Sequence, residues 1–255
     1  GLSNQYGSDN VFIGTNSGAA NLGNQGEYNG SYNIFLGNHS GQLNTYGNAN
    51  LFLGYGSGSS NTVGSENIFL GTNAGMNNIN GNYNIFFGAS VGHGNISGAN
   101  NVFMGFMSGH FNESGNDNVF IGQHAGFYNE TGNHNVAIGM YSGKTLMGEY
   151  NTVIGAQAGS FYTGSSNVLI GSFANLTEDS DNKLVISNNP TDFPLISGDF
   201  ENKDLLFNAS VTVNDLLVLK PRATAPSDPE PGTIYFDSSD STLKVWDGTT
   251  WRGLW

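Results

Sequence analysis

The chain of 255 residues contains no cysteine and few basic residues. Without thiols, disulfide bridges and thiolate metal sites are excluded, so stability has to come from another source. Seven Lys and Arg stand against twenty Asp and Glu, which gives a net charge of −13. Without a basic cluster, nucleic acid and anionic membrane surfaces are not expected as partners. No apolar run approaches the roughly 18 residues of a membrane span, so membrane insertion is not expected either.

Proline and tryptophan are missing from the first two-thirds of the chain. All six prolines and all three tryptophans lie after residue 175, and so do all basic residues except Lys144. This change of composition predicts a boundary near residue 176. We expect a repeat domain over 1–175, a β-rich neck over 176–220 and a C-terminal β-meander over 221–255.

The first domain consists of a repeat. Ten times an asparagine is followed by three mostly apolar residues and a glycine, and six of the nine intervals between these asparagines are 17 residues. They are Asn10, Asn33, Asn50, Asn67, Asn84, Asn101, Asn118, Asn135, Asn151 and Asn167. We count positions within a coil from this asparagine as position 0; most copies have a second glycine at position 8. Such a period indicates a solenoid in which neighbouring coils bury each other's apolar residues.

The apolar residues at positions 1 to 3 predict a strand. Residues at positions 1 and 3 point to one face and the residue at position 2 to the other, so a strand covered on both faces is expected. Length changes fall only between the second glycine and the next asparagine, which places that segment in surface loops. Stacked asparagines should form amide ladders along the axis. A second ladder is expected from Asn44, Asn61, Asn78, Asn95, Asn112 and Asn129.

Position 2 is phenylalanine in seven coils. These residues are Phe12, Phe35, Phe52, Phe69, Phe86, Phe103 and Phe120. If the Val and Ile side chains fill a narrow interior, the phenylalanines form an outer aromatic stripe that would need a subunit interface. The alternative is a monomeric solenoid with phenylalanine inside and Val and Ile against its own second sheet.

Two segments show a resemblance to a known family. Gly-Asn-His-Asn-Val-Ala-Ile-Gly at 132–139 and Asn-Thr-Val-Ile-Gly at 151–155 resemble the N-x-V-A-I-G repeats of YadA-like heads of trimeric autotransporter adhesins, which also occur in bacteriophage tail fibres. The resemblance covers about residues 7–175. It implies an all-β fold, a left-handed parallel β-roll solenoid in a homotrimer. The aromatic stripe described above then predicts the seven phenylalanines at the trimer interface. Phenylalanine at position 2 and the longer repeat depart from the prototypical adhesin head.

The C-terminal part is similar to other fibre segments. Residues 182–187 and 194–200 resemble a stretch that follows such repeats in fibre proteins, and 226–255 resembles a small module of tail fibres. Independently of that likeness, 226–255 predicts an antiparallel β-meander with turns at 238–241 and 247–248. Its tryptophans are expected in the hairpin core, the alternative being a ligand platform.

Chemistry-bearing motifs are sparse. No acidic residue recurs in every repeat, which excludes a calcium-binding β-roll, and the glycine spacing is not a phosphate loop. No cofactor and no metal are expected. His93 and His110 occupy the same position in successive coils, and with Phe111 and Tyr128 they form the candidate ligand-binding site, for a glycan or, in a trimer, a metal. The alternative is that they are exposed edge residues. Glu113 and Glu130 are expected to be solvated.

These patterns predict a structural protein without enzymatic activity. The first hypothesis is a trimeric, receptor-binding tail fibre of a phage or phage-like virion that mediates host attachment, with neighbouring fibre or baseplate proteins and a cell-surface glycan or protein receptor as partners. Its location would be extracellular. One alternative is a bacterial surface adhesin of the trimeric autotransporter type. Another is a polysaccharide depolymerase spike, which would require paired carboxylates in a groove.

Overall fold

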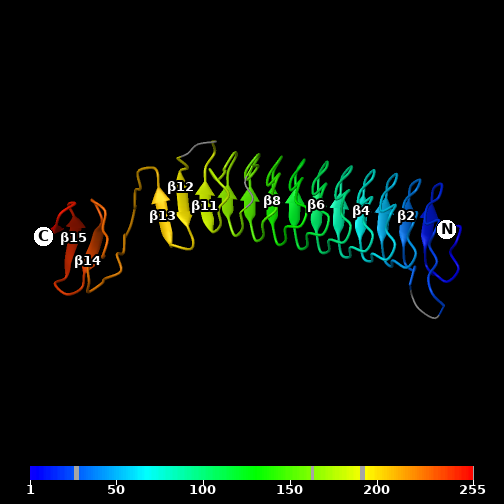
Figure 1. The fold of residues 1–255 in the computed structure, drawn as a ribbon, viewed down its shortest axis with the longest axis horizontal. Coiled ribbons are helices and arrows are strands. Elements are labelled where there is room, and N and C mark those ends of the chain that lie inside the picture. Colours follow the sequence, from blue (N-terminus) through cyan, green and yellow to red (C-terminus); the bar gives the residue numbers. More distant parts are fainter. Residues whose placement is uncertain (26–28, 162–163, 190–192, 255) are drawn as a thin grey trace. The chain divides into compact units, whose positions relative to one another are not determined.

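The computed structural model describes residues 1–25, 29–161, 164–189 and 193–254. These residues form strands, turns and bends, and no helix occurs among them. The chain divides into two compact units, Gly1–Ala209 and Ser210–Trp255, each of which is described by itself (Figure 1). The expectation of an all-β protein is confirmed.

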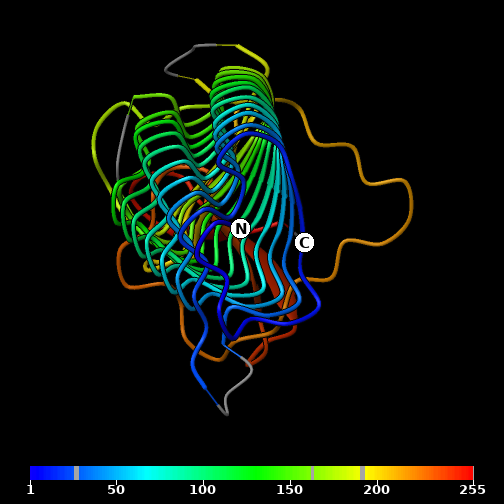
Figure 2. The ribbon, with the colours of Figure 1, turned by 90° about the vertical axis from the view of Figure 1, so that its right-hand side faces the viewer.

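Each repeat contributes one strand of three residues, formed by positions 1 to 3 of its coil. The strands are β1 (Val11–Ile13), β2 (Ile34–Leu36), β3 (Leu51–Leu53), β4 (Ile68–Leu70), β5 (Ile85–Phe87), β6 (Val102–Met104), β7 (Val119–Ile121), β8 (Val136–Ile138), β9 (Thr152–Ile154) and β10 (Val168–Ile170). Each pairs in parallel with the next, so that Phe69 lies between Phe52 and Phe86. Figure 2 looks along the row of strands and shows the coils overlaid. The predicted parallel solenoid is therefore present.

Three further strands extend the same sheet beyond the repeats. β11 (Lys183–Ile186) is parallel to β10, whereas β12 (Ile196–Asp199) and β13 (Asp204–Phe207) follow in antiparallel order. All three belong to the first compact unit. The region expected to form a separate neck thus begins as a continuation of the solenoid sheet.

The second unit contains the predicted antiparallel meander. Its strands are β14 (Ile234–Asp237), β15 (Thr242–Trp246) and β16 (Trp251–Gly253), paired in that order. The Asp237 carboxylate accepts a hydrogen bond from the backbone N–H of Ser239 at 2.9 Å and so fixes the first turn. The rings of Trp246 and Trp251 pack together with centroids 5.4 Å apart, as expected of a hairpin core, and Trp255 lies outside the described residues.

The phenylalanines at position 2 lie inside the coils. From Phe35 to Phe120 they are fully buried within a single chain, with successive ring centroids 4.8 to 4.9 Å apart. Phe12, in the first coil, is partly buried and stacks on Phe35 at 5.0 Å. The prediction that these seven residues form the trimer interface is wrong: phenylalanine lies inside, as the alternative placed it, whereas Val and Ile point outward and not against a second sheet of the same coil.

The glycine at position 8 explains why an aromatic ring fits in so small a coil. A Cβ atom added to Gly58 or Gly75 would overlap the ring of Phe52 or Phe69, respectively. Both glycines also have φ near +55°, a conformation that side chains disfavour. The missing side chain supplies the volume that the ring occupies, and the three-residue strand then turns positions 1 and 3 outward.

The last repeats fill the interior in a different way. Position 2 is Ala137 in β8, and Leu146 stands where the preceding coil has Asn129. Leu146 is 2% exposed, and a Cβ on Gly143 would lie 3.1 Å from its Cδ2 and 3.2 Å from the Cβ of Ala137. One leucine therefore replaces the volume of an absent phenylalanine.

Two ladders of buried asparagine run along the coils, as predicted. In the first, the backbone N–H of Asn67 donates to Oδ1 of Asn50 at 3.0 Å, and its amide donates to the carbonyl of Gly81 at 2.8 Å. In the second, the Asn61 amide donates to Oδ1 of Asn44 at 2.7 Å. These bonds satisfy backbone and side-chain groups that the narrow interior shields from water.

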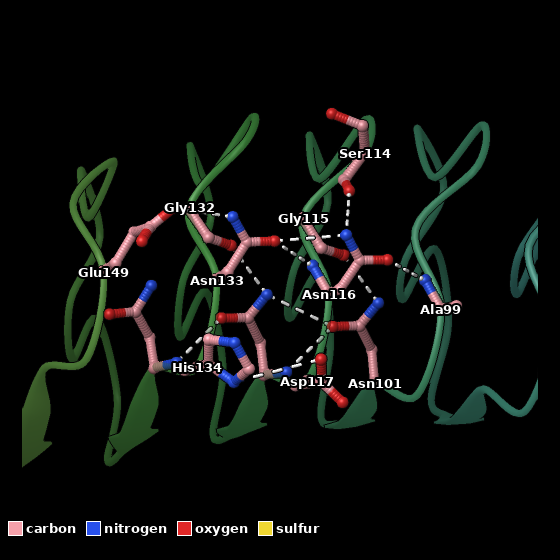
Figure 3. Close-up of polar contacts among 12 residues, drawn as sticks. Ala99, Asn101, Ser114, Gly115, Asn116, Asp117, Gly132, Asn133, His134 and Glu149 are labelled. Atoms are coloured by element: carbon pink, nitrogen blue, oxygen red, sulfur yellow. Dashed lines mark hydrogen bonds and ion pairs between the residues drawn. The ribbon is translucent and has the colours of Figure 1, made fainter.

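A third, surface ladder was not predicted (Figure 3). The backbone N–H of Ala99 donates to Oδ1 of Asn116, and the N–H of Asn116 donates to Oδ1 of Asn133, both at 2.9 Å. The Asn133 amide in turn donates to the Glu149 carboxylate at 2.9 Å. The residue two places before each repeat asparagine varies among Asn, Ser, Ala and Glu, so the periodicity of this ladder was obscured.

Candidate assembly face and ligand groove

The outward side chains of the parallel sheet form an apolar surface, which we call the outer sheet face. It consists of positions 1 and 3 of each coil. In β1 to β10 these residues are Val11, Ile13, Ile34, Leu36, Leu51, Leu53, Ile68, Leu70, Ile85, Phe87, Val102, Met104, Val119, Ile121, Val136, Ile138, Thr152, Ile154, Val168 and Ile170. All are at least partly exposed, and Ile85 and Phe87 reach 42% and 52%.

The outer sheet face carries no charged side chain across these ten strands, and Thr152 is its one polar residue. Leu184 and Ile186 of β11 continue it in register with Val168 and Ile170. With about 4.8 Å between strands and about 3.3 Å per residue, β1 to β10 cover about 43 Å by about 10 Å. Exposed apolar surfaces of this size usually mark interaction sites.

The structure brings the four predicted ligand residues together. His93 and His110 stack with ring centroids 4.9 Å apart, and Phe111 and Tyr128 stack at 5.4 Å with an interplanar angle of 2°. The rings of His110 and Phe111 meet edge to face at 4.7 Å. The four side chains therefore form one cluster on successive loops, and their role in ligand binding stays a prediction.

A groove of about 470 Å³ adjoins this cluster, away from the outer sheet face. Its lining includes both histidines, Phe111, Gly94 and Glu113. Phe111 is 41% exposed and Glu113 is also exposed. The groove combines aromatic and aliphatic surface with a few hydrogen-bonding groups, which is the usual composition of small-ligand sites.

The two histidines differ in their surroundings. Burial, and secondarily the charge of His110, lowers the pKa of His93 below its ordinary value. His93 is therefore neutral at pH 7. His110 Nδ1 lies 2.9 Å from the carbonyl oxygen of Ser90, so that nitrogen must donate, and Nε2 is the nitrogen left for a hydrogen bond with a ligand.

Three further residues adjoin the cluster: Phe127, which the sequence placed next to the histidines in successive coils, and Tyr141 and Lys144, which it did not single out. Phe127 stacks on His110 at 5.3 Å, and Lys144 lies over the rings of Tyr128 and Tyr141 at 5.9 and 5.7 Å. Phe127 lies one 17-residue period after His110, and Lys144 lies one period after Phe127. Extending the position 9 alignment by one more coil was the signal that could have identified Lys144.

Neither a metal centre nor a membrane span is seen in the described ranges. No three His, Asp or Glu side chains there group closely enough to hold a metal ion. Likewise, none of the described segments forms an apolar helix of the length that crosses a bilayer. The stacked pair His93 and His110 thus lacks a third ligand within the described part of the chain.

The fold and these surfaces define a β-solenoid protein with an unpartnered apolar sheet face and a ligand-sized groove. Comparison with protein-family models, with curated proteins and with solved structures found no match to the chain.

Proposed function

We propose that the chain is a subunit of a homotrimeric fibre that attaches a phage-like particle to a cell surface. The observation that supports this proposal is the outer sheet face. It runs uncharged over ten in-register strands, and no other part of the described first unit packs on the exposed residues that form it.

The physical reason is the cost of leaving this face in water. About 25 cal/mol is gained per Å² of apolar surface removed from solvent, so burying even about 400 Å² contributes about 10 kcal/mol before the entropic cost of association. Three copies with their outer sheet faces toward a common axis would bury it along the length of the solenoid. The trimeric state follows the resemblance to YadA-like heads, with Val, Ile and Leu in place of phenylalanine at the interface.

The arrangement also suits a fibre because every coil repeats the same contacts. Stability rises with each stacked coil, and loops of different length can be carried without changing the sheet. The loops on the far side from the outer sheet face would remain free to meet a receptor. No catalytic residues are assigned, and the role proposed is structural and adhesive.

The oligomeric state tests the proposal. We expect a mass of three times the 27.0 kDa of the chain by light scattering after gel filtration. The double variant Ile68→Asp/Ile85→Asp should be monomeric, because it places carboxylates on the outer sheet face. The matched control Ile79→Asp/Ile96→Asp changes two residues of equal type and similar exposure away from that face and should remain trimeric.

A monomeric wild-type chain would refute the trimer, and so would a trimer that survives the first double variant unchanged. Immunogold labelling with antibodies to the chain then distinguishes the biological setting. Label on particle tails supports the virion fibre, whereas label confined to the bacterial surface would favour an adhesin.

A further inference from the structure

The groove beside the aromatic cluster exists because one side chain is missing at position 10. Residues at this position in successive coils lie above one another and form a column along the solenoid. At position 10, Phe111 and Tyr128 stack on each other in successive coils. The coil before Phe111 has Gly94 at this position, whereas Leu43, Ser60 and Asn77 occupy it in earlier coils. The ring face of Phe111 opposite Tyr128 therefore has no side chain of the column against it and borders the groove.

The backbone conformation does not demand glycine at this place. Gly94 is not among the residues with positive φ, unlike the glycines at positions 4 and 8. Its backbone N–H donates to the carbonyl of His110 at 2.7 Å, and an added Cβ would lie 2.9 Å from that oxygen. The missing side chain at Gly94 therefore leaves space beside the Phe111 ring, and both residues line the groove.

The groove offers polar groups around this aromatic wall. His93 and His110 line it together with Glu113, and the side chains of Asn77 and Ser60 line it further along the same column. Amide, hydroxyl, imidazole and carboxylate groups can together accept and donate several hydrogen bonds. A ligand with an apolar face and several hydroxyl groups is complementary to such a site.

Charge selects among such ligands. The chain has a net charge of −13, and Glu113 lies in the groove itself. Lys144 is the only Lys or Arg before residue 175, and it lies over Tyr128 and Tyr141 instead of lining the groove. An anionic sugar would be repelled here, whereas an uncharged one would not.

We propose that this groove binds a neutral pyranose residue of a cell-surface glycan, with the apolar face of the sugar stacked on Phe111. The biological meaning rests on the attachment function proposed above. The groove itself is formed by one chain, so its binding does not depend on the trimer.

Binding is tested with the full chain at pH 7.5. A glycan array carrying neutral hexose and N-acetylhexosamine oligosaccharides, with sialylated and sulfated counterparts, identifies the glycan, and saturation-transfer NMR with that oligosaccharide measures the affinity. We expect binding to neutral glycans only. Phe111→Ala should weaken it by about tenfold or more, because the stacking surface is lost. Gly94→Leu should do the same by filling the groove.

The matched control is Leu43→Ala, which truncates an exposed residue of the same column that does not line the groove and lies three coils from Gly94, and it should leave binding unchanged. Absence of binding to every neutral glycan on the array would overturn the proposal, as would equal affinity in the Phe111→Ala and Leu43→Ala variants. A trimer without glycan binding would refute only the groove. Glycan binding by a monomeric chain would refute only the trimer.

Discussion

Phe52 and Gly58 fit together as two halves of one packing unit: the ring of the first occupies the space where the second has no side chain. The same pairing recurs at Phe35 and Gly41 and at Phe103 and Gly109. The two most regular features of the repeat, an aromatic residue and a glycine six positions later, therefore have one common cause. The coil interior holds one ring per turn and no more.

Gly58→Ala is expected to destabilise the protein by about 2 to 4 kcal/mol, because the methyl group overlaps the Phe52 ring and the backbone has φ +56°. In the Phe52→Ala background the overlap is gone, so the same change should cost only about 1 kcal/mol. Urea unfolding of the wild type, the two single variants and the double variant gives the coupling free energy between Phe52 and Gly58. Equal costs in both backgrounds would show that the ring and the glycine are independent.

Phe86 and Phe87 are neighbours in sequence but lie on opposite faces of β5, with 0% and 52% exposure. Phe86→Ala should lower the free energy of unfolding by about 3 to 5 kcal/mol, because it opens a cavity in the ring stack. Phe87→Ala should leave monomer stability within about 1 kcal/mol of wild type and weaken self-association instead. The two substitutions are compared by denaturant unfolding in the Ile68→Asp/Ile85→Asp background. Because that background is expected to be monomeric, it reports monomer stability without the contribution of self-association. The reverse order of effects would contradict the assignment of the faces.

Asn129 ends the second asparagine ladder, and its Oδ1 has no hydrogen-bond partner because Leu146 follows it in the column. Leu146→Asn alone should cost about 2 to 4 kcal/mol by leaving space beside Ala137, and Ala137→Phe alone about 1 to 3 kcal/mol by overpacking against Leu146. The double variant restores the ring and amide of the earlier coils and should cost less than the sum. Strict additivity in thermal unfolding would argue against a shared volume.

The junction of β11 and β12 should loosen in acid. The Lys183 ammonium, 2.7 Å from Asp199, and the N–H groups of Asn202 and Glu201 hold the pKa of the Asp199 carboxyl well below its ordinary value of 3.8. A lowered pKa in the folded state stabilises the fold above that ordinary value, and the contribution is lost as the pH falls below about 4.

Amide hydrogen exchange measures this effect at the two strands. Protection factors in β11 and β12 should drop between pH 6 and pH 2 in the wild type, most of the loss falling below pH 4. Asp199→Asn should reduce protection at pH 6 and remove most of the pH dependence. Unchanged protection in the wild type over this range would contradict the role of the ion pair.

Much of this architecture could be predicted from periodicity alone. The 17-residue interval fixes which residues stack, so the parallel register of Phe52 on Phe69 and the two buried asparagine ladders were predicted correctly. The same alignment placed His93 over His110 and led to the cluster with Phe111 and Tyr128. The groove was not predicted, because it arises from the absence of a side chain at Gly94.

The direction of the strand faces was decided only by the tertiary structure. Side chains alternate along a strand, so position 2 points to one side and positions 1 and 3 point to the other. Because the residues on both sides are apolar, this alternation does not show which side is inside. The glycine at position 8 settles the question, because it leaves room for one aromatic ring and not for two branched side chains. By itself, the sequence determined the coil and its register. The closed volume of the coil determined that phenylalanine forms the core and that valine, isoleucine and leucine face outward.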